Sequence, residues 1–182
     1  MTGQKPKLAD AVEDFGNRDN YNRALGFIDF LESRKINTQW TNSNADLHTW
    51  KAVKKGTTVC YIKTSSENEG SLSIMPHYHN DYIGFPEKSA NLVPGTLITV
   101  NPKSGKYDEI ISDEKLMDMI CSKISKCTDC GNKKKCAPGI NINWWGKELN
   151  NRCKFINSPF VNPDYAELEC LKTLIDIFVD KL

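Results

Sequence analysis

Three short segments decide the fold class of this chain: LHTWKAV (47–53), TVCYIK (58–63) and SLSIM (71–75). Each is rich in β-branched, aromatic or alternating apolar residues and is bounded by a polar or glycine-containing connection, which is typical of strands. The connection KKGT (54–57) is a tight turn and residues 65–70 form a loop, so neighbouring segments pair antiparallel. The alternation in the last segment places Leu72 and Ile74 on its buried face. Residues 47–75 therefore predict a three-stranded antiparallel meander.

Two helices are predicted before the meander. Residues 7–15 form a short helix, and a second helix takes Asp19 or Asn20 as its N-cap and continues to about residue 35. The apolar stripe of the second helix recurs at helical spacing and consists of Tyr21, Ala24, Leu25, Ile28 and Leu31. The polar run from Thr41 to Ala45 is predicted to be a loop.

Two further helices are predicted after the meander. One begins near Ser112, and the other begins at Asn162-Pro163-Asp164 with the proline at the first helical position. Their apolar stripes are Leu116, Ile120 and Ile124 for the first helix, and Leu168, Leu171, Ile175, Phe178 and Leu182 for the second. With a short strand at Leu97–Val100, the sequence predicts an α+β fold. An antiparallel sheet, made of the meander plus additional short strands, is packed by N-terminal, central and C-terminal helices.

Length and composition indicate an ordinary globular protein. A chain of 182 residues with 39% hydrophobic and 26% charged residues suits a single α+β domain over residues 1–182. The formal net charge of +1 argues against a general nucleic-acid or membrane-surface role. We expect no secretory signal, because residues 1–7 are not followed by an apolar segment, and no segment has the length of apolar sequence that crosses a membrane.

The most distinctive motif is a cysteine cluster, since five of the seven cysteines lie between residues 121 and 153. Four of them are spaced as C-x2-C-x5-C followed, after sixteen residues, by a last cysteine: Cys127, Cys130, Cys136 and Cys153. Two cysteines separated by two residues form a knuckle whose sulfurs face one ion, and four thiolates complete the tetrahedron of a structural zinc. The sequence predicts a zinc-knuckle-like loop within a cysteine-rich, metal-binding subregion at 121–156.

The choice of Cys153 rests on a predicted hairpin. Residues 140–145 are expected to form a strand, residues 146–150 a turn, and residues 153–156 the return strand that brings Cys153 back to the knuckle. Cys121 is a competing ligand. Three alternatives stay open at this point: an iron–sulfur cluster, because Cys121 and the knuckle also read as C-x5-C-x2-C-x5-C, a disulfide-bonded loop, and a set of reduced, partly buried thiols.

The same stretch is the basic part of the chain. Residues 121–154 carry 8 basic and 2 acidic side chains, a net of +6, against −2 for residues 1–120 and −3 for residues 155–182. The lysines at 123, 126 and 133–135 offset the negative charge of four thiolates on a divalent ion. The alternative is a phosphate-binding patch that makes a nucleic-acid contact through residues 121–154, although the overall charge disfavours nucleic acid as a partner.

Candidate chemistry outside the cysteine cluster is sparse. His77 and His79 lie two residues apart, so on an extended segment they face the same side, and with Asp81 they have the spacing of a small metal or catalytic site. Cys60 is a conceivable nucleophile that would pair with His77 or His79. A thiol in the middle of an apolar strand, however, has a raised pKa and is inert. The candidates for lining a ligand pocket are Trp50, Trp144, Trp145, His77 and His79.

The sequence therefore favours binding over catalysis. It contains no phosphate-binding glycine loop, dinucleotide fingerprint, nucleophile elbow or H-E-x-x-H motif. An odd number of cysteines without an export signal indicates a reducing compartment, the cytoplasm. We expect a non-enzymatic module that binds a small molecule or a partner protein and is stabilised by zinc. The alternative is an enzyme with a site near His77, His79, Asp81 and Cys60.

Overall fold

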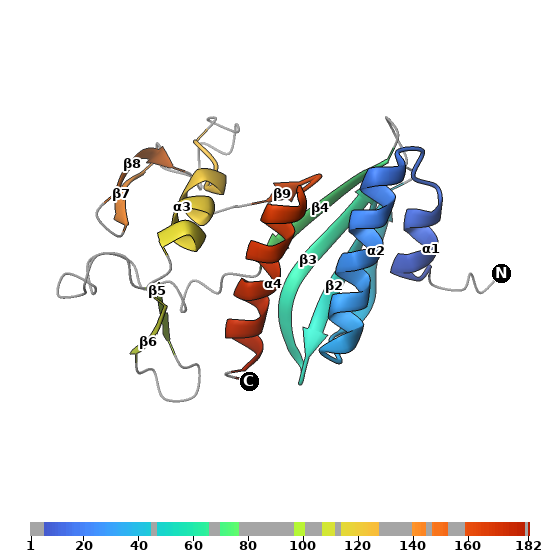
Figure 1. Ribbon diagram of the computed structural model, residues 1–182, viewed down its shortest axis with the longest axis horizontal. Coiled ribbons are helices and arrows are strands. Elements are labelled where there is room, and N and C mark those ends of the chain that lie inside the picture. Colours follow the sequence, from blue (N-terminus) through green and yellow to red (C-terminus); the bar gives the residue numbers. More distant parts are fainter. Residues whose placement is uncertain are drawn as a thin grey trace. The chain divides into compact units, whose positions relative to one another are not determined.

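The computed structural model describes residues 6–44, 47–65, 70–76, 97–100, 107–111, 114–127, 140–144, 147–152, 159–180 and 182. The chain divides into two compact units (Figure 1). Unit 1 consists of Met1–His77 and Pro159–Leu182, and unit 2 consists of Tyr78–Ser158. Unit 1 is therefore formed by two separate stretches of chain. The expectation that residues 1–182 form one domain stays a prediction.

Unit 1 is built on a five-stranded antiparallel sheet with the order β1-β2-β3-β4-β9. The strands are β1 Asn37–Asn44, β2 Leu47–Lys54, β3 Thr57–Ser65, β4 Ser71–Pro76 and β9 Phe160–Val161. The central three strands confirm the predicted meander, and their boundaries lie within two residues of the predicted ones. Together with the helices, this sheet confirms the α+β fold class.

The core of unit 1 follows the register of the sheet. Trp50 lies opposite Ile62, Ile62 opposite Ile74, and Ile74 opposite Phe160, so one row of large apolar side chains crosses four strands. All four side chains are at most 1% exposed. The next row brings Ala52 opposite Cys60, and both are fully buried. Because side chains alternate between the two faces of a strand, these rows define one buried face.

Helices α2 Arg18–Ser33 and α4 Tyr165–Val179 cover the same face of the sheet (Figure 1). They bury Ala24, Phe27, Ile28 and Leu31 from α2, and Leu168, Cys170, Leu171, Leu174 and Ile175 from α4. Arg34, just after α2, donates two hydrogen bonds of 2.7 Å to the Asp176 carboxylate on α4 and so joins the two helices. The short helix α1 Leu8–Glu13 packs on α2.

Both helix starts differ from the prediction. The cap of α2 is Asn17, whose side-chain oxygen accepts from the N–H groups of Asp19 and Asn20 at 3.0 Å, so the two predicted caps lie inside the helix. Asp164 caps α4 by accepting from the Glu167 N–H at 2.8 Å, and the Glu167 carboxylate accepts from the Asp164 backbone N–H at 3.1 Å. Pro163 therefore precedes the cap and is not the first helical residue. In both cases a short side chain that bonds the helix N-terminus sets the boundary.

Two strands of unit 1 are absent from the sequence prediction. The predicted loop from Thr41 to Ala45 is wrong over residues 41–44, which belong to the edge strand β1. This strand is mostly polar, yet it pairs along its whole length with β2, with an irregularity between Trp40 and Asn42. The second strand, β9, has only two residues and completes the opposite edge. Both strands form because they pair with a neighbouring strand. Neither has the alternation of apolar and polar residues that would predict a strand from its sequence.

Unit 2 contains one described helix and two hairpins. The residues of the predicted stripe are all buried: Leu116 and Ile120 in the helix α3 Glu114–Lys123, and Ile124 just after it. Cys121, which lies beside the stripe, is buried as well. One hairpin pairs β5 Leu97–Val100 with β6 Tyr107–Ile111, and the other pairs β7 Ile140–Trp144 with β8 Lys147–Arg152.

The second hairpin corrects the prediction for this region. Residues 147–150, predicted to be a turn, lie in β8, and the connection between β7 and β8 spans only residues 145–146. A two-residue connection is the length that tight hairpins prefer. The predicted return strand at 153–156 lies outside the described residues. Within those residues, no helix combines the length and the apolar character needed to cross a membrane.

Candidate functional site

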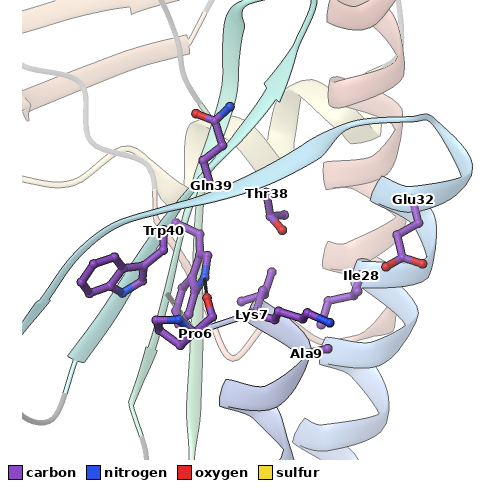
Figure 2. Close-up of a pocket in the computed structure, with 10 residues that line it drawn as sticks. Pro6, Lys7, Ala9, Ile28, Glu32, Thr38, Gln39 and Trp40 are labelled. Atoms are coloured by element: carbon purple, nitrogen blue, oxygen red, sulfur yellow. Dashed lines mark hydrogen bonds between the residues drawn. The ribbon is translucent and has the colours of Figure 1, made fainter. Parts of the chain in front are cut away.

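A cavity of about 500 Å³ lies in unit 1 between α1, α2 and the edge of the sheet (Figure 2). We call it the tryptophan pocket. It is lined by Pro6, Lys7, Leu8, Ala9, Ile28, Glu32, Thr38, Gln39, Trp40 and Trp50. This volume is within the range of cavities that bind small organic ligands, and the mixed apolar and polar lining is typical of them.

Two tryptophans form the aromatic part of the pocket. Trp40 on β1 and Trp50 on β2 are direct partners in the antiparallel register, which places their side chains together on the buried face. Trp50 is 1% exposed, and its indole N–H donates to the carbonyl oxygen of Pro6 at 3.3 Å. This bond fixes the chain segment that leads into α1 against the sheet. Trp50, which the sequence predicted as a pocket residue, lines this cavity.

Trp40 differs from Trp50 in the state of its indole nitrogen. The Trp40 Nε1 atom is buried, and it has no acceptor among the residues that the structure describes. A buried N–H without an acceptor costs about 1 to 3 kcal/mol, so such groups are rare unless a water or ligand supplies the acceptor. The Trp40 side chain lines the pocket, but its Nε1 atom is itself buried and is not exposed to the cavity.

Two opposite charges complete the lining. Lys7 precedes α1 and Glu32 lies on the last turn of α2, and both side chains are exposed. Figure 2 shows Trp40 and Pro6 on one side of the pocket, Glu32 and Ile28 on the other, and the Lys7 side chain extending toward Ile28. No ion pair joins Lys7 to Glu32 in the described structure. Each charge is thus left to interact with water or with a ligand.

Cys60 does not belong to this pocket. Its side chain is fully buried in the sheet, and burial alone raises the pKa of the thiol from 9.0 to about 12. At neutral pH almost none of it is thiolate, which is the nucleophilic form. Its proposed partners His77, His79 and Asp81 lie outside the described residues, so the catalytic arrangement of these four side chains stays a prediction.

Of the four predicted zinc ligands, the first, Cys127, lies among the described residues. Cys127 is half-buried, and its backbone N–H donates to the carbonyl oxygen of Asn151 at 2.8 Å. Lys126 and Arg152 form an antiparallel bridge, and the Arg152 side chain donates to the carbonyl oxygen of Ile124 at 2.7 Å. These contacts attach the chain just before the knuckle to the end of β8. The residue that follows β8 is the fourth predicted ligand.

The remaining ligands are not among the described residues. Cys130, Cys136 and Cys153 lie outside them, and the described part of the chain holds no group of three or more histidine, cysteine, aspartate or glutamate side chains arranged to bind a metal. The competing ligand Cys121 is buried at the end of α3. The zinc-knuckle-like loop is therefore not part of the described structure.

Several other predicted positions also fall outside the described parts. These are His77, His79, Trp145 and the lysines at 133–135, and of Trp144 only the backbone in β7 is described. Conversely, no motif in the sequence marks these pocket residues as site residues: Lys7, Glu32, Thr38, Gln39 and Trp40. Trp40 carried the only available signal, as a tryptophan in an otherwise polar stretch. Thr38 and Gln39 enter the pocket through the pairing of β1 with β2, and Lys7 and Glu32 enter it through the packing of α1 and α2.

Comparison with known proteins adds no relationship. No family model matches the chain, and neither a curated protein nor a solved structure is similar to it.

Proposed function

We propose that this protein is a non-enzymatic binding module that takes a small molecule into the tryptophan pocket. The observation that carries the proposal is the cavity of about 500 Å³ that Trp40 and Trp50 line together with apolar side chains of α1 and α2. The apolar surface of Leu8, Ile28 and Trp50 supplies affinity by burial, and the polar groups at the rim supply orientation. The described lining contains no cysteine, histidine or serine, and its two titratable side chains, Lys7 and Glu32, are exposed, which favours binding over catalysis.

The indole N–H signals of nitrogen-15-labelled protein test this function. Each of the four tryptophans gives one such signal, and a library of small aromatic fragments should shift that of Trp40. Ala9→Leu places a larger side chain in the pocket lining and should abolish the shift. Ala166→Leu is the matched control, because Ala166 is an exposed alanine on α4 that does not line the pocket. If no fragment shifts the Trp40 signal at millimolar concentration, or if Ala9→Leu leaves the shifts intact, the proposal is wrong.

We further propose that Cys127, Cys130, Cys136 and Cys153 hold a structural zinc in unit 2, in the reducing cytoplasm. Support comes from the attachment of Lys126 and Cys127 to Asn151 and Arg152, which brings the chain that enters the knuckle beside the chain that enters Cys153. The described cysteines Cys60, Cys121, Cys127 and Cys170 are free thiols. Four thiolates close the coordination sphere, so the metal has no position for a substrate.

Elemental analysis of the purified protein tests the metal directly, with one zinc per chain as the expected result. Cys130→Ser should release it and raise amide hydrogen exchange in α3, β7 and β8, while unit 1 keeps its protection. Cys170→Ala removes a buried thiol of α4 in unit 1 and should leave the zinc content unchanged. A metal-free protein, iron in place of zinc, or full retention of zinc by Cys130→Ser would contradict the proposal.

A further inference from the structure

We propose that the sheet of unit 1 binds single-stranded nucleic acid on the face opposite its helices, a site separate from the tryptophan pocket. Helices α2 and α4 cover the face that carries Trp50 and Ile62 (Figure 1). Since side chains alternate between the two faces of a strand, the neighbouring residues point to the opposite side, which we call the outer face. The strand register arranges its central side chains in two rows: Gln39, Lys51 and Tyr61 in one row, and Thr49, Lys63 and Ser73 in the other.

Charge is segregated between the two layers of unit 1. Helices α1, α2 and α4 carry eight carboxylates against three cationic side chains, whereas the five strands contain three lysines and no aspartate or glutamate. Lys54 donates to the backbone carbonyl oxygens of Arg34 and Lys35 at the end of α2. The other two lysines, Lys51 and Lys63, point to the outer face, and neither forms an ion pair in the described structure. A polyanion complements this face, although the net charge of the chain is only +1.

Tyr61 places an aromatic ring beside both lysines. It is the register partner of Lys51, whose Nζ atom lies 6.0 Å from the centre of the ring, and Lys63 lies two residues further along the same strand. The Tyr61 side chain is half-buried and Lys63 is exposed. Unpaired bases stack on aromatic rings of sheet faces, and neighbouring lysines bind the phosphates. A single strand uses the ring and both cations, whereas an acidic peptide needs only the cations.

The other side chains of the outer face suit the same ligand. Gln39, Thr49 and Ser73 carry an amide and two hydroxyls, which bind phosphate and sugar oxygens without a charge. Figure 2 shows the Gln39 side chain directed away from the tryptophan pocket, in agreement with its place on the outer face. Met75 and Val161 extend the two rows, and Val161 is 58% exposed. The face therefore offers apolar surface for bases as well as cations for phosphates.

Fluorescence anisotropy of a labelled oligouridylate of about 12 nucleotides tests this surface in the full chain. We expect a Kd below about 100 μM at low salt, and a tenfold rise in salt should raise the Kd about 25-fold, since two phosphate contacts give a slope of about 1.4 on logarithmic axes. Lys51→Gln combined with Lys63→Gln should raise the Kd about tenfold and flatten this slope. Tyr61→Leu keeps an apolar side chain but removes the ring, and it should raise the Kd about tenfold without changing the slope.

Lys123→Gln combined with Lys126→Gln is the matched control, because it removes two lysines from the basic stretch of unit 2. This control should change the Kd by less than about twofold. Backbone amide signals of the natural chain give a measurement that needs no variant, and the oligonucleotide should shift those of β2, β3 and β4.

Four results would overturn the proposal: no binding at about 100 μM, no shifts in β2, β3 and β4, unchanged affinity in the variant that lacks both outer-face lysines, or an equal loss in the unit 2 control. A polyglutamate peptide of similar length should bind more weakly than the oligonucleotide, and so should a duplex, whose bases are already stacked. If either binds as tightly as the single strand, Tyr61 has no stacking role and the assignment of the ligand is wrong.

Discussion

The two units of this chain use different means to stay folded. Unit 1 places large apolar side chains from a five-stranded sheet and two long helices in one core, with Trp50, Phe27, Phe160, Ile62 and Leu171 all at most 1% exposed. The described part of unit 2 has one helix of ten residues and two hairpins of two strands each. An isolated two-stranded hairpin is marginally stable in water. Within its described residues, unit 2 buries the apolar side chains of Leu116, Ile120, Cys121, Ile124 and Leu149 and joins its segments by specific hydrogen bonds. The comparison can be tested unit by unit.

The largest effect is expected from Phe160 in the core of unit 1. Phe160→Ala removes a fully buried ring at the short strand β9 and should lower the free energy of unfolding of unit 1 by about 3 to 5 kcal/mol. Denaturant unfolding followed by hydrogen exchange would show the loss in β2, β3, β4 and α4. The neighbouring Val161 is the control, since it is 58% exposed and Val161→Ala should change stability by less than about 0.5 kcal/mol. Equal effects of the two substitutions would contradict this description of the core.

A second prediction concerns pH and Cys60, which is also in unit 1. The thiol keeps its proton in the folded state up to a pKa of about 12 but loses it in the unfolded state near 9.0. Between these values the unfolded state binds fewer protons, so the free energy of unfolding falls as pH rises, by up to about 1.4 kcal/mol per pH unit. Below pH 9 the group contributes no pH dependence. In Cys60→Ala, the free energy of unfolding should decline less steeply between pH 9 and 11 than in the natural chain. Identical slopes for the variant and the natural chain would contradict the raised pKa of Cys60.

The third prediction concerns a tie within unit 2. Asn151 has a φ of 53°, its carbonyl oxygen accepts from the Cys127 N–H, and its own N–H donates to the Asn141 side chain at 3.0 Å. Asn151→Ala places a Cβ-bearing residue without a compensating side chain in the left-handed region, which costs about 1 kcal/mol. Exchange of the Cys127 amide should accelerate about fivefold. Glycine adopts the same backbone conformation without strain, so Asn151→Gly should exchange the Cys127 amide at nearly the rate of the natural chain. A similar acceleration of this exchange in both variants would show that the positive φ is not the cause.

The smallest expected effect is a gain in unit 1. Gly26 lies inside α2, and a Cβ built on it would meet nothing within 4 Å. Gly26→Ala should therefore stabilise unit 1 by about 0.5 to 1 kcal/mol, because alanine loses less backbone entropy in a helix. Gly70 provides the contrast: it has a φ of 86°, and an added Cβ would lie 2.5 Å from Phe15. Gly70→Ala should destabilise unit 1, and a stabilising effect there would contradict the close contact.

Much of unit 1 was predictable from local sequence. The strands at 47–53, 58–63 and 71–75 carry β-branched residues and alternation, and the stripe of α4 repeats at helical spacing, so each element is encoded where it forms. The edge strand β1 was missed because its polar residues have no such alternation. It forms by pairing with β2, and a pairing partner is not visible in the sequence of the strand itself.

The pocket escaped prediction for the same reason. Trp50 was selected as a lining candidate, but its partner Trp40 and the charged pair Lys7 and Glu32 are brought together by tertiary contacts between α1, α2 and the edge of the sheet. Short sequence motifs identify sites whose residues are close along the chain. The pocket residues span positions 6–50 and come from α1, α2, β1, β2 and the segment before α1, and no spacing rule connects them.

The position of unit 2 within the chain has a consequence for protein synthesis. Unit 2 lies between β4 and β9, so the ribosome makes residues 78–158 after the first four strands and before the last strand and α4. At about 5 to 20 residues per second, the nascent sheet waits about 4 to 16 s for Phe160 and then α4 to cover Ile62 and Ile74. Unit 2 is continuous in sequence and can complete its own folding during this interval. A chaperone that binds exposed apolar sheet surface would therefore act on unit 1 while unit 2 is being made.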